Sequence, residues 1–129
     1  MKTRLLRCLA IGLTMSMLFS QRADAGIKGG ELYKYWTAYK HANEIWDKGG
    51  TVDETMMIVH AAKYQFYVAG IIDILLHEPK GLGCLPSTVT NGQLALIVGK
   101  YLEQHPEEHH LDAWLQVGWA VTNAFPCEK

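Results

Sequence analysis

The chain has 129 residues, of which 49% are hydrophobic and 19% are charged, and its formal net charge at pH 7 is −1. A chain of this length holds one domain with one small hydrophobic core. The near-neutral charge comes without a basic patch, which argues against nucleic acid and anionic membranes as partners.

The first 25 residues have the three parts of a cleavable secretory signal peptide. Lys2, Arg4 and Arg7 form a basic start, residues 9–19 form an uncharged apolar stretch, and residues 23–25 form a small-x-small cleavage site. The apolar stretch is shorter than the roughly 20 residues of a bilayer span, so a retained membrane anchor is the less favoured alternative. We expect an exported domain over residues 26–129. Its net charge would be −4 rather than −1, because cleavage removes four basic residues and one acidic residue, and this charge suits a basic protein partner.

Apolar residues recur every three or four positions between residues 32 and 46, which predicts a first helix that ends at Gly49 and Gly50. Its expected buried face consists of Leu32, Tyr35, Trp36, Tyr39, Ala42 and Trp46. Thr51 and Glu54 have the spacing of a capping box and predict the start of a second helix over residues 53–76.

The second helix is expected to bury one stripe, made of Met56, Val59, Ala62, Phe66, Tyr67, Gly70, Ile71 and Ile74. A glycine inside a helix costs about 1 kcal/mol relative to alanine. Close packing of Gly70 against another helix would explain that cost.

Residues 78–89 carry the turn signals of the longest irregular segment. Thr90 and Gln93 then form a second capping box, and Val89 and Leu94 are placed as a hydrophobic staple. The third helix that follows is expected to point Leu94, Ile97, Val98, Tyr101 and Leu102 inward.

Pro106 is expected at the first position of a fourth helix, whose dipole Glu107 and Glu108 would complement. Its expected apolar face consists of Leu111, Trp114, Leu115, Val121 and Phe125, and Pro126 ends it. The pattern as a whole predicts an all-α protein, a compact bundle of about four helices without a convincing strand.

Cys84 and Cys127 are the two cysteines of the predicted mature chain, because Cys8 leaves with the signal peptide. In an exported chain, two cysteines most simply form a disulfide, here closing a loop of about 43 residues worth roughly 4 kcal/mol in the chain-entropy model. Two free thiols remain the alternative. Metal ligation is less favoured, because neither cysteine has the spacing of a zinc site.

Residues 105–110 contain the order H-x-x-E-H, which is the pattern of inverted zinc proteases. Zinc binding would need both histidines on one helix face, and Pro106 biases His105 out of helical geometry. A third ligand would have to be His60 or His77. The alternatives are a solvated helix start and adventitious metal binding, so we predict no catalytic residue, no metal site and no cofactor.

Two other side chains are ambiguous. Asp73 lies beside the expected stripe, where a partly buried carboxylate is more often a structural hydrogen-bond acceptor than a catalyst. Trp119 lies off the expected apolar face and could mark a protein interface. Since no nucleophile elbow, phosphate loop or dinucleotide fingerprint is found, the residues by themselves predict an exported binding domain.

The second half of the chain contains a series of short motifs at fixed spacing: Cys84-Leu85-Pro86, Val89-Thr90, Gly92-Gln93-Leu94, Val98, Tyr101-Leu102, His105-Pro106-Glu107, His109, Ala113 and Ala124-Phe125-Pro126-Cys127. This series closely resembles the Rap/Tai immunity family. Upstream, residues 67–73 look like the Y-[IV]-x-G-[VI]-x-D helix of that family. The resemblance covers about residues 30–127.

This resemblance implies a periplasmic, helical, often dimeric protein. It implies protection of a bacterium against a peptidoglycan-cleaving amidase effector that type VI secretion delivers, through binding that covers the active site of the amidase. Many members of the family carry a second cysteine pair, at positions that correspond to Trp36 and Tyr64. A packed aromatic contact in place of that disulfide is therefore expected here.

The segment between the second helix and Cys84 is the first candidate for the contact with the effector, because irregular segments on rigid scaffolds commonly bind partners. The predicted partner-binding residues are His77, Glu78, Pro79, Lys80, Gly81, Leu82 and Gly83. Residues 105–110 are the second candidate, and a plain connector is the alternative for the first.

Two other functions compete with the immunity protein. One is a periplasmic helical binding or envelope-stress protein of the same fold that has no toxin partner. The other is an enzyme or metal protein that uses residues 105–110.

Overall fold

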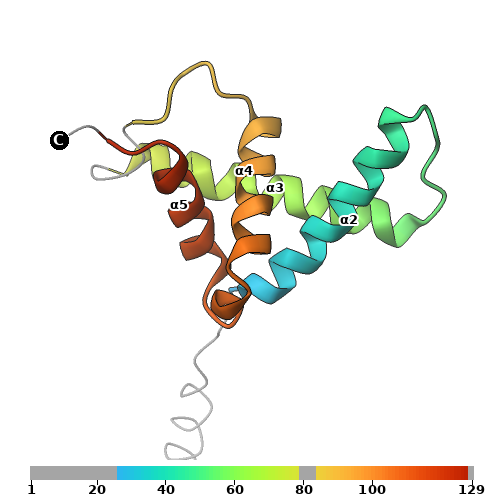
Figure 1. Cartoon of the computed structure of the whole chain (residues 1–129), viewed down its shortest axis with the longest axis horizontal. Coiled ribbons are helices and arrows are strands. Elements are labelled where there is room, and N and C mark those ends of the chain that lie inside the picture. The colour runs from blue at the N-terminus through green and yellow to red at the C-terminus, as the bar shows by residue number, and fades with distance from the viewer. Residues whose placement is uncertain (1–25, 79–83, 128–129) are drawn as a thin grey trace, which may run out of the picture.

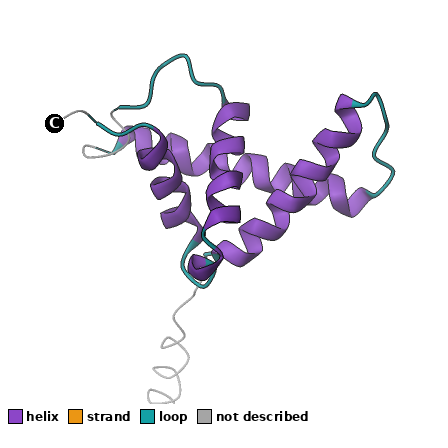
Figure 2. Cartoon of the chain, viewed as in Figure 1, coloured by secondary structure: helices purple, strands orange, loops and turns teal. Residues whose placement is uncertain are grey.

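The computed structural model describes residues 26–78 and 84–127, and the predicted signal peptide lies outside these residues. The described residues form four α-helices: α2 (Gly29–Asp47), α3 (Thr55–His77), α4 (Asn91–Gln104) and α5 (Ala113–Ala124). A short 3₁₀ helix, η1 (Pro106–Glu108), lies between α4 and α5. The all-α prediction with about four helices is confirmed over this part of the chain, where Figure 2 shows helices and loops but no strand.

Each of the four α-helices contacts the other three, and the contact between α2 and α3 is the most extensive. In Figure 1 helix α3 runs across the width of the view, and α4 crosses in front of it. None of the helices in residues 26–78 and 84–127 combines the length and the continuous apolar character needed to cross a bilayer.

The first helix buries the side chains that its periodicity predicts, from Leu32 to Ala42. Trp46 is the exception, because it is 47% exposed. The helix ends at Asp47, and Gly49 follows in the left-handed region with a φ of 72°, a conformation that glycine adopts without steric cost. The glycine pair therefore ends α2 as expected.

An aromatic cluster joins α2 to α3 and α4. The Trp36 ring lies 5.4 Å from the Tyr64 ring, and the Tyr39 ring lies 5.3 Å from the same tyrosine. Tyr64 is fully buried, and its hydroxyl donates a 2.7 Å hydrogen bond to the carbonyl of Ala95. The expected aromatic contact between Trp36 and Tyr64 is confirmed.

Gly99 on α4 allows this cluster to close. A Cβ atom at this position would lie 2.4 Å from three ring carbons of Trp36, so only glycine lets the indole rest on the backbone of α4. The predicted role of Gly70 was wrong, because it is exposed and a Cβ there would meet no atom within 4 Å. Gly99 on α4 is therefore closely packed, whereas Gly70 on α3 is not.

The two predicted capping boxes have different outcomes. At the start of α4, the Thr90 hydroxyl accepts from the Gln93 backbone N–H, and the Gln93 side chain accepts from the Thr90 N–H, so this box is confirmed. The box at Thr51 was wrong. Helix α3 begins at Thr55 after Glu54, which makes no side-chain cap.

The predicted buried face of α3 was wrong at most of its positions, although Tyr67 and Ile71 are partly buried against the core. The side chains that enter the core are Ala61, Tyr64, Val68 and Ile72. Phe66 is instead 77% exposed, Met56 61% and Ile74 59%. Apolar residues occur on every side of this helix, so their spacing does not identify the side that faces the core.

The fourth helix begins later than predicted. Pro106 starts η1, and α5 starts at Ala113. Residues 109–113 instead bind the chain in front of α2. Gly29 N–H donates to Leu111 O at 2.9 Å, Ala113 N–H donates to Ile27 O at 3.0 Å, and Lys28 pairs with Asp112 at 2.5 Å.

The start of α5 changes which of its side chains are buried. They are Ala113, Gln116, Val117, Ala120 and Val121, whereas Trp114, expected on the apolar face, is 46% exposed. The fully buried Gln116 amide donates a 2.7 Å hydrogen bond to the carbonyl of Glu108 and lies against Gly29, where a Cβ would be 2.0 Å from its nitrogen. This amide therefore holds η1 and the start of α2 together.

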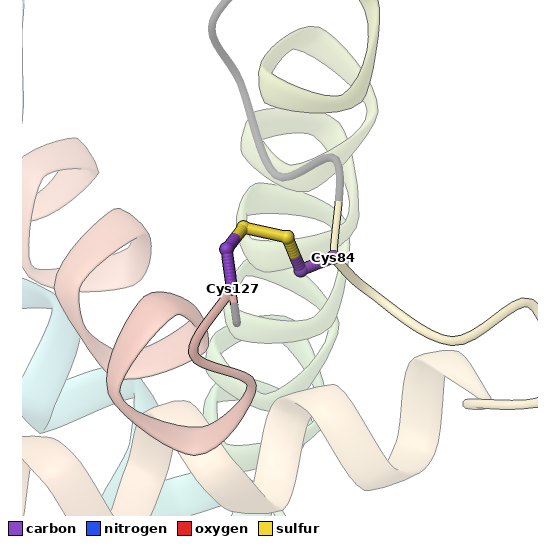
Figure 3. Close-up of a disulfide and its surroundings, with 2 residues drawn as sticks. All are labelled: Cys84 and Cys127. Atoms are coloured by element: carbon purple, nitrogen blue, oxygen red, sulfur yellow. A yellow bond between two sulfur atoms is a disulfide. The ribbon is translucent and has the colours of Figure 1, made fainter. Parts of the chain in front are cut away.

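The predicted disulfide between Cys84 and Cys127 is confirmed (Figure 3). The two Cα atoms are 5.3 Å apart, which is a normal separation for a disulfide. The bond ties the segment that follows α5 to the segment that precedes α4.

Candidate functional site

The first candidate segment lies next to the disulfide. His77 is the last residue of α3, Glu78 follows it in extended conformation, and both are exposed. The other five predicted residues, Pro79, Lys80, Gly81, Leu82 and Gly83, lie outside the described residues. The structure therefore gives the anchors of this segment, which are the end of α3 on one side and the Cys84–Cys127 bond on the other.

Contacts to α4 build the second candidate, the turn of residues 105–110. The rings of Tyr101 and His105 stack with centroids 4.2 Å apart, and the Tyr101 hydroxyl donates to a Glu108 carboxylate oxygen at 2.8 Å. Burial, assisted by this hydrogen bond, raises the pKa of Tyr101 to about 12. The tyrosine hydroxyl thus stays protonated and keeps Glu108 in place.

His109 fixes the other side of the turn. One of its ring nitrogens lies 2.9 Å from the carbonyl oxygen of Leu102, and its ring packs 4.8 Å from that of Tyr33. Its own carbonyl accepts from the Gly30 N–H at 2.9 Å. His109 therefore has a structural role and joins the turn to both α2 and α4.

Glu107 is the most exposed acidic group of the turn, with 67% of its side chain accessible. Its own backbone N–H and the neighbouring His105 ring, 3.2 Å away, lower the pKa of the carboxyl group. The group therefore stays ionised, and the turn presents negative charge to a partner.

The inverted zinc-protease pattern is not assembled as such. His105, Glu107 and Glu108 place one ligand atom each within 4.8 Å of one another, but His109 is not in that group. The Nε2 atom of His109 faces the Leu102 carbonyl, while Glu108 already accepts from Tyr101. The three grouped residues are those that could hold a metal ion, and they differ from the set that the pattern requires.

The disulfide that follows the first candidate segment lies at the opposite end of α5 from the turn. Cys84 is bonded to Cys127 beyond the end of α5, whereas residues 105–110 precede the start of α5 at Ala113. At about 1.5 Å per residue, the length of α5 is on the order of 18 Å.

The exposed apolar side of α3 is a surface that sequence reasoning assigned to the core. Two grooves flank Phe66 there. One, of about 720 Å³, has Gly70, Leu76, Leu85 and Val89 in its walls. The other, of about 710 Å³, is lined by residues that include Ile27, Tyr35, Val59 and Ala62. The excess of apolar residues in α3 was the signal that more than one side of the helix is apolar.

The two ambiguous side chains are both exposed. Asp73 has 78% of its side chain accessible, so the expectation of a partly buried carboxylate was wrong. Trp119 is 37% exposed, which agrees with its place off the apolar face of α5.

Comparison with known proteins identifies the family. The model of the Rap1a immunity proteins matches residues 29–127, from the first residue of α2 to the second cysteine of the disulfide. The chain has no significant match among curated proteins or among solved structures. Immunity proteins act by binding a cognate effector and are not catalytic, which agrees with a histidine turn whose members hold the fold together. The chain belongs to the Rap1a immunity protein family.

Proposed function

We propose that this protein is exported to the periplasm, where it protects the cell from a peptidoglycan amidase that type VI secretion delivers. It does so as a homodimer that binds the amidase and covers its active site. The observation that carries the proposal is the family match over residues 29–127, which spans nearly all of the predicted mature chain.

Two features support export. The first 25 residues have the order of charged, apolar and small residues of a signal peptide. The Cys84–Cys127 bond joins the segment before α4 to the segment after α5, and such bonds persist in oxidising compartments such as the periplasm.

The inhibitory contact is proposed at the segment from His77 to Gly83, with the turn of residues 105–110 as the second contact. The first segment starts at a long helix and ends at a disulfide, so less chain entropy is lost when it binds. The turn adds the ionised Glu107, which suits a basic surface on a protein partner.

The experiment is a binding and inhibition assay with mature protein. Residues 26–129 serve as bait for a periplasmic extract, and a small amidase encoded next to the gene is the expected prey. Purified protein should then block peptidoglycan hydrolysis by that amidase. A bait that retains envelope proteins but no hydrolase would contradict the proposal and support the envelope-stress alternative.

Two sets of variants locate the contact. Leu82→Asp with Gly81→Trp should weaken amidase binding at least tenfold, about 1.4 kcal/mol, without loss of helix content. Glu107→Lys should weaken amidase binding because it reverses the exposed charge of the turn. Glu44→Lys is the matched control, because Glu44 is an exposed carboxylate on α2 with 54% of its side chain accessible. Unchanged affinity in the Leu82 and Gly81 variant would move the contact to the turn.

A further inference from the structure

One row of α3 side chains is exposed along most of the helix. The row consists of Val59, Lys63, Phe66, Gly70, Asp73 and His77, and each of these residues is exposed. The steps along the row alternate between four and three residues, which is the spacing of the seam residues of a coiled coil. The opposite side of α3 faces the core through Tyr64 and Val68. Helix α3 therefore has a second seam with no partner within the described part of the chain.

The middle of this row has a protrusion and a gap. Phe66 is a large apolar ring with 77% of its surface exposed, between two grooves of about 720 and 710 Å³. One turn further on, Gly70 has no side chain, and a Cβ there would meet no atom within 4 Å. An exposed aromatic ring next to an apolar groove is typical of a protein interface.

We propose that a second copy of this chain covers the row, with the two α3 helices antiparallel about a twofold axis at the level of Val68. This inference rests on the homodimer of the proposed function and specifies its surface. In this register Phe66 of each copy fills the gap over the partner's Gly70. The same axis places Val59 opposite the partner's His77, so the whole row is matched with itself.

Charge fixes the direction of the pairing. In the antiparallel register, Lys63 faces the partner's Asp73 twice, once on each side of the axis. A parallel register would place Lys63 against Lys63 and Asp73 against Asp73, which is repulsive. It would also leave the two Phe66 rings against each other and the two gaps at Gly70 unfilled.

Each of these two charged groups makes a surface contact within its own copy. The Lys63 ammonium lies over the ring of Tyr35 at 5.3 Å from its centre, and an Asp73 carboxylate oxygen lies 3.8 Å from a ring nitrogen of His77. Both contacts are at the surface and leave room for a partner. Such a twofold contact is the usual form of a dimer interface, in which one surface patch binds a copy of itself. From Val59 to His77 it runs for about 27 Å along the helix.

A cysteine cross-linking experiment tests the register directly. In one copy, positions 63 and 73 lie about 15 Å apart along α3, too far for a disulfide. Between antiparallel copies they face each other. The double variant Lys63→Cys with Asp73→Cys should therefore form a covalent dimer under mild oxidation, and each single variant should stay monomeric on a non-reducing gel. Cross-linking of a single variant as efficiently as the double variant would overturn the register.

Solution mass measurements test the surface. Phe66→Asp should convert the dimer to a monomer with unchanged helix content, since the ring is exposed. Leu96→Asp on α4 is the matched control, because Leu96 is 48% exposed but lies outside the row, and it should leave the dimer intact. Lys63→Glu should weaken the dimer at least tenfold, and adding Asp73→Lys should restore it.

Amidase assays separate this inference from the proposed function. A wild-type dimer that is unchanged by Phe66→Asp would overturn the inference. A wild-type protein that is monomeric would also overturn it. If Phe66→Asp then abolished amidase binding, the row would be a contact surface for the effector. Failure of every candidate amidase to bind would count against the proposed function alone, because the dimer measurements do not depend on it.

Discussion

Trp36 packs against Tyr64 with 5.4 Å between ring centroids and 48° between ring planes, and this contact joins α2 to α3. Resemblance to the Rap/Tai family places a second cysteine pair of many relatives at these two positions. An aromatic contact therefore links the two helices here without a covalent bond. The same indole rests on Gly99 of α4, so three helices meet at one ring.

A double-mutant cycle measures this contact. Trp36→Leu and Tyr64→Leu should each reduce the free energy of unfolding, and the two losses should not add, with a coupling of about 1 kcal/mol. Chemical denaturation of the four proteins of the cycle gives this value. Losses that add within about 0.3 kcal/mol would show that the rings do not stabilise each other.

Gly99→Ala should destabilise the fold by on the order of 1 to 3 kcal/mol, because its Cβ would overlap the Trp36 ring. Gly118→Ala is the matched control in α5. Its Cβ would lie 3.6 Å from a methyl carbon of Leu75, an ordinary contact, so the better helix propensity of alanine should keep or raise stability. Equal melting temperatures for the two variants would contradict the packing described for Trp36.

Removal of the disulfide should lower the free energy of unfolding by roughly 4 kcal/mol, the chain-entropy value for a loop of this size. Cys84→Ser with Cys127→Ser is compared with wild type by denaturant titration, and wild-type protein in reductant should match the variant. Intact-mass analysis of protein taken from the periplasm should show no thiol that can be alkylated. Two alkylated cysteines without prior reduction would contradict the bond.

The Glu103 carboxylate should make stability depend on pH. Lys40 and the Trp36 indole N–H donate to it at 2.9 and 3.0 Å, and both lower the pKa of the carboxyl group below 4.5. A lowered folded pKa gives stability that is present above pH 4.5 and lost as the pH falls through the folded value. The effect should be modest, because 35% of the side chain is exposed.

Glu103→Gln isolates that charge, since glutamine keeps an acceptor for the indole. At pH 7 the variant should be less stable than wild type, and the difference should shrink as the pH falls below 4.5 towards the lowered folded pKa. Denaturant titrations at these pH values measure it. A difference that stays constant over this range would rule out the carboxylate as the cause.

Local signals in the sequence predict much of this fold. The Thr90 and Gln93 box depends on neighbouring residues alone, and the face of α2 stands out because polar residues occupy its other side. The disulfide follows from the small number of cysteines in the predicted mature chain. These features need no knowledge of the other helices.

The predictions that were wrong concern features of the fold that tertiary contacts determine. The α3 helix has apolar residues on all sides, so its spacing could not show that Val68 faces the core and Phe66 faces solvent. Pro106 is a good first residue for a helix, but the pairing of residues 109–113 with the chain before α2 delays α5 to Ala113. The burial of Gln116 depends on a carbonyl of η1 and on Gly29, which are distant along the chain from each other.

In the candidate site, too, local patterns could be predicted, whereas contacts between distant residues could not. Sequence patterns indicated the turn of residues 105–110 as a candidate site. They suggested that its histidines are metal ligands or helix-start residues. The structure assigns His109 to the carbonyl of Leu102 and the ring of Tyr33, and sequence spacing does not show either contact.

Inhibition of peptidoglycan hydrolysis is the direct test of the proposed immunity function. The predicted mature protein, residues 26–129, is titrated into a candidate amidase, with purified peptidoglycan as substrate, and the release of soluble fragments is followed. The account predicts complete inhibition at a one-to-one ratio of the two chains, and less inhibition by Glu107→Lys than by the Glu44→Lys control. Full amidase activity in the presence of a large excess of folded, disulfide-bonded protein would contradict it.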